Sequence, residues 1–254
     1  FEMSFNHSIT PSFIEKHLCE NWSWTWLSCN PSITPSFIEK HLEKEWDWYS
    51  LSKNPSITPG FVEKHLTVKW IERWDWCGLC GNISITLQFI EKTIERGWME
   101  RLDLHRLSEN PTITPEFIEK HPEIKWDWSS LSENPSITSE FVEKHIDEKW
   151  DWTYLSENPS ITPDFIEKHP EKEWCYVFLC ENPSITLEFI EKNKEINWRW
   201  RDLSCNPSIT PEFIEKHIEK KWNYYNFFIS ERAKIERNKI IMKNFKEHLH
   251  AYRI

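Results

Sequence analysis

The chain has 254 residues, of which 41 are Asp or Glu and 31 are Lys or Arg, so its formal net charge is −10. This surplus of negative charge repels polyanions and argues against a general nucleic-acid-binding or anionic-membrane-binding protein. Only 4 residues are Gly, whereas 17 are Trp and 15 are Phe. The scarcity of glycine largely excludes flexible linkers and glycine-rich phosphate-binding loops.

The cysteines and the apolar residues indicate an intracellular protein. Seven cysteines cannot all pair within one chain, and they do not recur at one position, so a disulfide framework is not expected. No apolar run approaches the roughly 18 residues that a membrane span needs. The first residues, FEMSFNHSIT, lack the basic start and the apolar stretch of a signal peptide. We therefore expect a reducing compartment and no membrane partner.

The sequence repeats itself at a short interval, which indicates an array of similar modules and not one large domain. A threonine that follows an isoleucine marks each of nine repeats: Thr10, Thr34, Thr58, Thr86, Thr114, Thr138, Thr162, Thr186 and Thr210. The spacing between successive marker threonines is 24 residues, except for two spacings of 28. We expect a lead-in over residues 1–9, nine repeats over residues 10–229 and a C-terminal capping helix over residues 230–254.

The first half of each repeat has the start signals of a short helix. The marker threonine can cap the helix N-terminus with its side-chain oxygen, and in six repeats a proline follows at the first helical position. At about 100° per residue, Phe13, Ile14 and His17 fall on one face, whereas Glu15 and Lys16 point elsewhere. The sequence predicts an amphipathic helix of about two turns.

The second half of each repeat contains a tryptophan twelve residues after the marker threonine. A further tryptophan often stands two positions later, as in Trp46 and Trp48, which would also suit a strand. The two 28-residue repeats insert four residues after Trp70 and after Trp98, which is close to one helical turn and favours a second helix. We expect this helix to end at a recurring asparagine, such as Asn54, in a left-handed conformation.

Two short helices cannot bury their apolar faces alone, so neighbouring repeats must stack. The expected fold is all-α, an α-solenoid of nine helix-turn-helix repeats. The alternative is a leucine-rich-repeat-like β-solenoid, because a 24-residue period and an Asn three positions after a Leu suit it. The tryptophans expected to be buried by stacking are Trp22, Trp46, Trp70, Trp98, Trp126, Trp150, Trp174, Trp198 and Trp222.

Three motifs that recur together point to a family of repeats. WDW, LSxNPSIT and FIEKH cover nearly the whole chain, which ends in HAYRI. This combination resembles the Trp-rich tandem repeats of many giant DNA virus proteins of the mimivirus type. The resemblance implies a viral origin and hence a place in the infected host cytoplasm or in the virion. It implies no particular activity, because the repeats have none assigned as a class.

The most metal-like features are recurring histidines and a CxxC pair. A histidine follows the Glu-Lys pair in seven repeats, but stacked repeats place these rings about 10 Å apart, whereas zinc is bound at roughly 2.0–2.1 Å. Cys77 and Cys80 lack the second pair of ligands that a zinc site needs. Cys80 also occupies the position of Ser52 in another repeat. We expect structural roles, with no metal, no cofactor and no catalytic residue.

The two positions before the constant leucine of the second helix vary from repeat to repeat, so they are free to adapt to a partner. Large aromatic and arginine side chains at such positions are typical of protein interfaces. The candidate partner-binding residues are Trp26, Tyr49, His105, Arg106, Tyr154, Phe178, Arg201 and Tyr225.

The expected function is that of a non-enzymatic scaffold for protein–protein interaction, which binds a host factor or forms part of the virion. The alternative is an RNA-binding array in which two variable residues per repeat recognise one nucleotide. The net charge opposes this alternative, although residues 231–254 contain seven basic and three acidic residues. An enzyme with a site between repeats is a third hypothesis, for which the sequence offers no catalytic constellation. The sequence determines neither the identity of the partner nor the oligomeric state.

Overall fold

The described part of the chain is all-α. The computed structural model describes residues 6, 8–66, 71–225 and 227, and these residues form α-helices and short 3-10 helices but no strand. The β-solenoid alternative is therefore wrong for these residues. The expected capping helix over 230–254, Trp70 and most of the lead-in lie outside the described residues. Within the described ranges no helix has the length and apolar character that a membrane span requires.

The chain divides into two compact parts, Phe1–Ile137 and Thr138–Ile254. The helices of the first part are α1 (Pro11–Lys16), α2 (Trp24–Leu27), α3 (Pro35–Lys40), α4 (Trp48–Lys53), α5 (Pro59–His65), η2 (Ile71–Arg73), α6 (Trp76–Gly81), α7 (Leu87–Glu95), η3 (Met99–Arg101), α8 (Leu104–Glu109), α9 (Pro115–Lys120) and α10 (Trp128–Leu131). The helices of the second part are α11 (Ser139–Lys144), α12 (Trp152–Leu155), α13 (Pro163–Lys168), α14 (Tyr176–Glu181), α15 (Leu187–Lys192), α16 (Trp200–Leu203) and α17 (Pro211–Lys216).

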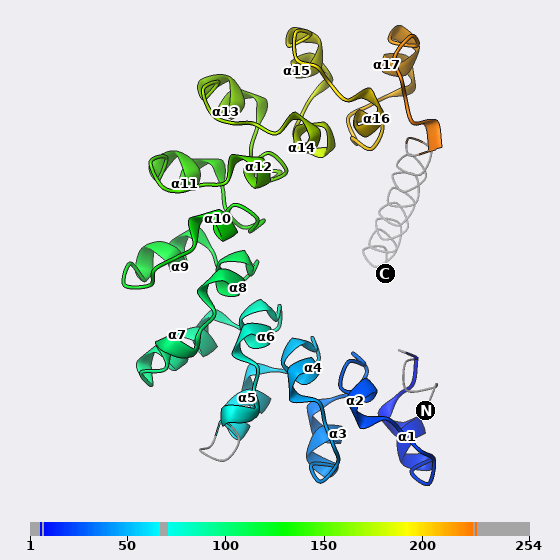
Figure 1. The fold of residues 1–254 in the computed structure, drawn as a ribbon, viewed down its shortest axis with the longest axis vertical. Helices are drawn as coiled ribbons and strands as arrows, with labels where there is room; N and C mark the ends of the chain where they lie inside the picture. Colours follow the sequence, from blue (N-terminus) through cyan, green and yellow to red (C-terminus); the bar gives the residue numbers. More distant parts are fainter. Residues whose placement is uncertain (1–5, 7, 67–70, 226, 228–254) are drawn as a thin grey trace, which may run out of the picture. The chain divides into compact units, whose positions relative to one another are not determined.

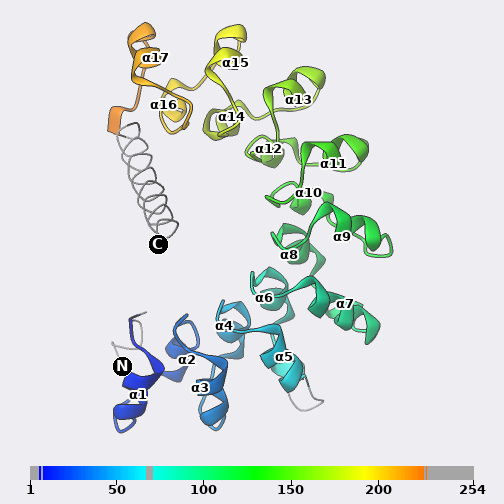
Figure 2. The ribbon, with the colours of Figure 1, turned by 180° about the vertical axis from the view of Figure 1, so that it is seen from behind.

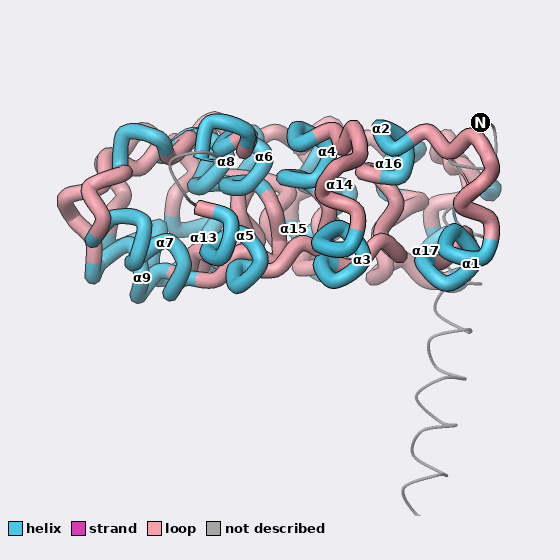
Figure 3. Tube along the Cα trace, turned by 90° about the horizontal axis from the view of Figure 1, so that it is seen from below, coloured by secondary structure: helices cyan, strands magenta, loops and turns pink. Residues whose placement is uncertain are grey.

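The helices of each part form two rows. Odd-numbered helices are the first helices of the repeats and even-numbered helices are the second, and each kind forms its own row (Figures 1 and 2). Seen from below, the two rows of the first part lie at different levels (Figure 3). Helices of the even row contact one another, α4 with α6, α6 with α8, α8 with α10 and, in the second part, α14 with α16.

The first helix of each repeat begins where the sequence predicts. Thr34 is the N-cap of α3, its side-chain oxygen accepts a hydrogen bond from the backbone N–H of Phe37 (3.4 Å), and Pro35 occupies the first turn. The bond satisfies one of the amides that a helix start leaves unpaired. The same cap starts the helices after Thr58, Thr86, Thr114, Thr138, Thr162, Thr186 and Thr210.

The tryptophan twelve residues after the marker threonine bonds to the end of the first helix of its own repeat. The Nε1–H of Trp46 donates a hydrogen bond to the backbone oxygen of His41 (2.9 Å), where α3 ends. The buried indole also lies edge-on to Phe37, with 6.2 Å between ring centroids. The bond satisfies a carbonyl that the helix end leaves free. Equivalent indole bonds are made by Trp22, Trp126, Trp150, Trp174, Trp198 and Trp222.

The second tryptophan of the WDW motif makes the aromatic contact between repeats. Trp24 lies edge-on to Trp46 of the next repeat, with 5.1 Å between ring centroids, and it also contacts Phe37 and His41. The same pair is formed by Trp48 with Trp74, Trp152 with Trp174 and Trp200 with Trp222. Stacking between repeats therefore involves two indoles, one from each repeat.

The four extra residues of the 28-residue repeats form a separate 3-10 turn and do not lengthen the second helix. In the third repeat, η2 precedes Trp74, and Trp74 is the indole that packs against Phe61 and Trp48. Asp75 then caps α6 by accepting a hydrogen bond from the backbone N–H of Gly78 (3.0 Å). Because this cap fixes the start of the helix, the insertion falls before the second helix and is not part of it.

The fourth repeat shows the same arrangement. The 3-10 helix η3 precedes Leu102, which is buried at the position that Trp46 occupies in the second repeat. Trp98, expected to be a stacking residue, is only half-buried and lies edge-on to Trp76 at 6.4 Å. Asp103 then caps α8.

A buried asparagine joins each repeat to the preceding one. The Nδ2 of Asn54 donates hydrogen bonds to the backbone oxygens of Ser28 (2.9 Å) and Asn30 (3.0 Å), and its Oδ1 accepts one from the backbone N–H of Ser56 (2.9 Å). We call the equivalent residues the asparagine ladder: Asn30, Asn54, Asn82, Asn110, Asn134, Asn182 and Asn206.

The expected left-handed conformation of these asparagines is wrong. Asn54 has φ −72° and ψ 123°, and no described residue other than a glycine has a positive φ. The side chain of the asparagine explains its recurrence. Its amide group donates to two backbone carbonyls of the preceding repeat and accepts from one backbone N–H of its own repeat. These polar groups would otherwise be buried without partners.

The residue two positions before a ladder asparagine, a serine or in two repeats a cysteine, adds a further bond between repeats. The Oγ of Ser52 donates to the backbone oxygen of Trp48 (2.8 Å) and accepts from the backbone N–H of Asp75 in the next repeat (3.0 Å). Cys80 and Cys180 occupy this position in their repeats, and each buried thiol accepts from the following repeat's backbone N–H. Burial raises the pKa of Cys80 to about 12 and that of Cys180 to about 11. These thiols therefore stay protonated at neutral pH.

Replacing a ladder asparagine should destabilise the protein strongly. Asn182→Ala leaves the backbone oxygens of Ser156, Asn158 and Ile161 without this donor. We expect the free energy of unfolding, measured by urea titration with circular dichroism, to fall by about 2–4 kcal/mol. Asn197→Ala, an exposed asparagine of the next repeat, should change it by less than about 0.5 kcal/mol. Equal effects of the two substitutions would refute a structural role of the ladder.

The indole N–H should matter at some tryptophans and not at others. Trp174 donates its N–H to His169 O (2.9 Å), whereas the buried N–H of Trp74 has no partner among the residues that the structure describes. Trp174→Phe should therefore cost about 1 kcal/mol more than Trp74→Phe, since both remove similar apolar area. Urea unfolding of the two variants measures this difference. A larger loss at position 74 would contradict the assignment.

Candidate functional site

Most of the candidate partner-binding residues on the second helices are exposed. In the first part Trp26, Tyr49, His105 and Arg106 are exposed, with Tyr49 at 57 %. Arg106 and His105 both contact Glu109, at 2.9 Å each. The leucine that follows each variable pair is buried.

In the second part Tyr154, Arg201 and Tyr225 are exposed, with Tyr225 at 74 %. Phe178 is half-buried, and Tyr176, two residues earlier, is the exposed aromatic residue of α14. Tyr176 occupies the position of the second WDW tryptophan and lies edge-on to Trp198 at 6.3 Å. Tyr176 lies outside the two variable positions, so the variation between repeats does not single it out.

The CxxC pair lies on α6 beside a shallow hollow of about 310 Å³ lined by Lys53, Cys77, Gly78, Gly81 and Arg106. A Cβ at position 78 would come within 2.7 Å of Asp75 Oδ2 and 3.0 Å of Lys53 Cγ, so this glycine allows α4 and α6 to pack closely. A hydrogen bond to Asp103, together with burial, raises the pKa of Cys77. Among the described residues no group of three potential metal ligands is present.

Ion pairs connect the first helices of successive repeats. The Lys of one repeat pairs with the Glu of the preceding repeat, as Lys64 does with Glu39 (2.9 Å). Other pairs are Lys40 with Glu15, Lys92 with Glu63, Lys120 with Glu91, Lys168 with Glu143, Lys192 with Glu167 and Lys216 with Glu191. In four repeats the histidine also approaches the same glutamate: His65, His121, His169 and His217.

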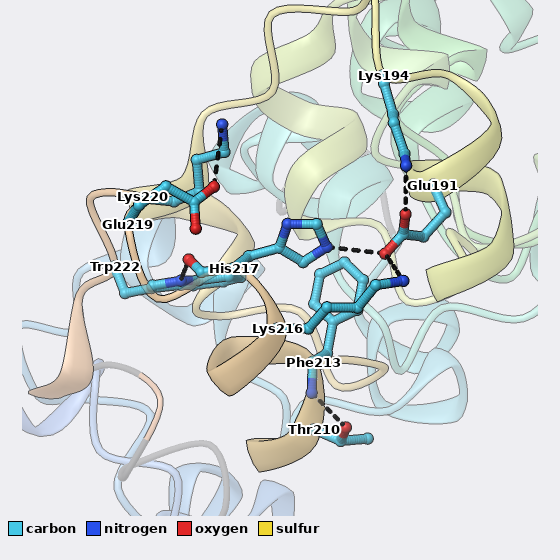
Figure 4. A network of polar contacts seen from close by, with 9 residues as sticks. All are labelled: Glu191, Lys194, Thr210, Phe213, Lys216, His217, Glu219, Lys220 and Trp222. Carbon is cyan, nitrogen blue, oxygen red and sulfur yellow. Dashed lines mark hydrogen bonds and ion pairs between the residues drawn. The ribbon is translucent and has the colours of Figure 1, made fainter.

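Glu191 has the most extensive network of these carboxylates (Figure 4). Its oxygens lie 2.8 Å from Lys216 Nζ, 2.7 Å from His217 Nε2 and 3.0 Å from Lys194 Nζ. The hydrogen bonds from Lys216, His217 and Lys194, in that order of effect, lower the pKa of Glu191 to about 2. The carboxylate is therefore ionised throughout the physiological range.

A cavity of about 270 Å³ adjoins this network in the second part. Ile190, Trp198 and Trp200 form its apolar wall, and Lys194 and Lys220 lie at its edge. The ammonium of Lys220 lies 5.4 Å from the ring centroid of Trp200, which is a cation–π distance.

Glu191, His217 and Glu219 complete the lining of the cavity. Glu219 pairs with Lys220 (3.4 Å). A cavity with an aromatic wall, converging charged groups and a strongly shifted pKa is the default candidate for a binding site.

One sequence difference distinguishes this repeat from all the others: Lys194 stands at a position that is Leu, Ile or Pro elsewhere. Asn193 also replaces the recurring histidine, as Thr93 does in the fourth repeat. Lys194 supplies the third cation to Glu191. This charged residue at an otherwise apolar position is the sequence signal that marks the network.

Acid should weaken the fold partly through Glu191. Its pKa is about 2 in the folded protein against 4.5 for an ordinary glutamate, so its contribution is present above pH 4.5 and is lost as the pH falls from about 5 to 2. Glu191→Gln should therefore reduce the pH dependence of the unfolding free energy between pH 5 and 2.5, measured by urea titration. Glu195→Gln, which removes an exposed carboxylate nearby, should leave that dependence unchanged. Identical pH profiles for the wild type and Glu191→Gln would contradict the assignment.

Comparison of the chain with family models, with curated proteins and with solved structures finds no match.

Proposed function

We propose that the chain is a non-enzymatic scaffold, an α-solenoid of nine repeats, which binds a protein partner through the exposed side of its even-numbered helices. The observation that carries the proposal is that each of these helices has a buried side, which packs against neighbours, and an exposed side. On α4, Leu51 and Ser52 are buried, whereas Tyr49 is exposed. Packing thus fixes one side of the helix and leaves the other free to vary.

The exposed residues have the chemistry of a protein interface. Trp26 and Tyr49 on neighbouring helices of the first part offer large, rigid surfaces, and Arg106 adds a guanidinium group on the same row. Tyrosine, tryptophan and arginine are the residues that most often dominate binding energy. Because the row presents different residues in each repeat, a partner that spans several repeats would be recognised by their combination.

The repeated motifs support a viral origin for the scaffold, in the infected host cytoplasm or in the virion, because WDW, LSxNPSIT and FIEKH resemble repeats of giant DNA viruses. The formal charge of −10 supports a protein partner over RNA.

Substitutions on the row should abolish partner binding without unfolding the protein. We expect the combined variant Trp26→Ser, Tyr49→Ser and Tyr154→Ser to lose, by at least tenfold, a protein that the wild type captures from infected cells, as quantified by mass spectrometry. The matched control is Leu18→Ser, Ile83→Ser and Ile218→Ser, which removes three exposed apolar residues that are not on the even-numbered helices.

Two outcomes contradict the proposal. One is equal capture by the row variant and the control variant, with circular dichroism showing that both are folded. The other is binding of RNA that falls steeply with salt while protein capture is absent, since a steep salt dependence marks phosphate contacts.

A further inference from the structure

The hollow beside α6 belongs to the even row of the first part. It has a volume of about 310 Å³, and its lining residues are Lys53 of α4, Cys77, Gly78 and Gly81 of α6, and Arg106 of α8. We propose that this hollow is an anchor pocket, which receives an uncharged aromatic side chain of the protein partner. The inference rests on the proposed scaffold function and names the chemical group that the row recognises at this point.

Two glycines create the hollow. Gly81 stands at a position that carries Lys53 in the preceding repeat and a glutamate in each of the four repeats that follow. A Cβ at position 81 would meet nothing nearer than the Cδ of Arg106 at 4.0 Å, so the space above this glycine is open. Gly78 is buried, and a Cβ there would come within 3.0 Å of Lys53 Cγ. With a volume near the lower end of the roughly 300–1,000 Å³ of ligand pockets, the hollow suits one large side chain.

The charged residues that line the hollow are both cations, Lys53 and Arg106. The ammonium group of Lys53 lies 3.7 Å from the ring centroid of Tyr49, so one cation–π contact is already made at this edge. Arg106 donates an N–H to Glu109 (2.9 Å), and a guanidinium paired in this way can still stack its planar face on an aromatic ring. A ring in the hollow therefore meets positive charge with its negative face.

The surroundings of the hollow disfavour a carboxylate as its occupant. Asp75 and Asp103 cap the helices α6 and α8, and Glu109 pairs with Arg106, so three carboxylates adjoin the two cations. A hydrogen bond to Asp103, together with burial and the charge of Asp103, raises the pKa of the Cys77 thiol. A negative charge is thus destabilised beside Cys77. An uncharged ring avoids this cost and keeps its attraction to the two cations.

The test uses the full chain, with N-acetyl-L-phenylalanine amide as the probe and the Cys77 thiol as the reporter. Alkylation of Cys77 by N-ethylmaleimide is measured by peptide mass spectrometry, relative to alkylation of the exposed Cys29. We expect the probe to slow the alkylation of Cys77 relative to Cys29 at least threefold. The amide of N-acetyl-L-cyclohexylalanine, which has a saturated ring, should give less than half of this protection, and N-acetyl-L-aspartate amide should give none.

Substitutions at glycine and lysine locate the probe. Gly81→Glu should abolish the protection, because it fills the hollow with the residue of the following repeats. Gly60→Glu is the matched control, because a Cβ at position 60 also meets nothing within 4 Å, but this glycine lies on α5 and does not line the hollow. It should leave the protection unchanged. Lys53→Met, which keeps the stem and removes the charge, should at least halve the protection by the aromatic amide. Circular dichroism establishes that each variant is folded.

Four results of the probe experiment would overturn the proposal. Absence of protection means that the hollow binds no ring. Equal protection by the aromatic and the saturated amide means that the cations do not select an aromatic ring. Stronger protection by N-acetyl-L-aspartate amide makes the hollow a carboxylate site. Protection that survives in Gly81→Glu means that the probe binds elsewhere.

Capture of the partner from infected cells is a separate measurement. Gly81→Glu should reduce, at least fivefold, the protein that the wild type captures, whereas Gly60→Glu should capture it normally. Unchanged capture by Gly81→Glu would overturn the anchor role. If the wild type captures no protein, the scaffold proposal fails, and the probe experiment still decides the chemistry of the hollow. If the probe gives no protection while the row variant loses the partner, the anchor pocket fails and the scaffold proposal stands.

Discussion

The asparagine ladder is the interaction on which the rest of the structure depends. Helices of four to seven residues, such as α2 and α5, leave many of their backbone groups without a partner of their own. The ladder amides satisfy carbonyls of the preceding repeat, and the neighbouring serine or cysteine accepts an amide of the following repeat. A single repeat therefore has unsatisfied polar groups as well as uncovered apolar surface, so its stability comes from its neighbours.

The sequence predicts the local helix starts well, because an N-cap threonine and a following proline act through bonds within three residues. It predicts long-range roles less well. Asn54 is a residue type, and stands at a position, typical of a helix C-terminus. Its side-chain hydrogen bonds, however, reach residues 24 and 26 positions away, and such long-range bonds cannot be predicted from a local pattern. In the third repeat the indole that packs against Phe61 and Trp48 is Trp74, sixteen residues after the marker threonine, because the N-cap Asp75 fixes the register from the far side of the insertion.

The candidate sites follow the same distinction. Exposure of Tyr49 could be predicted from free variation, since a position that packing does not constrain tends to face solvent. The difference between Phe178 and Tyr176 could not, because it depends on how α14 is rotated against the next repeat. The Glu191 network depends on three residues from two repeats, and only Lys194 stands out in the sequence as a charge at an apolar position.

The position of η2 and η3 has a consequence for how such a chain can change in length. Ladder bonds span 24 residues between ordinary repeats, as for Asn54 and Asn30, and 28 across the longer ones, as for Asn82 and Asn54, yet the donor–acceptor distance is 3.0 Å in both. The connector between the two helices absorbs the additional residues while the spacing of the backbone partners stays constant. Insertion of residues into this connector therefore leaves the hydrogen bonds between repeats unchanged. The same segment is a suitable point at which to insert an epitope or a reporter loop.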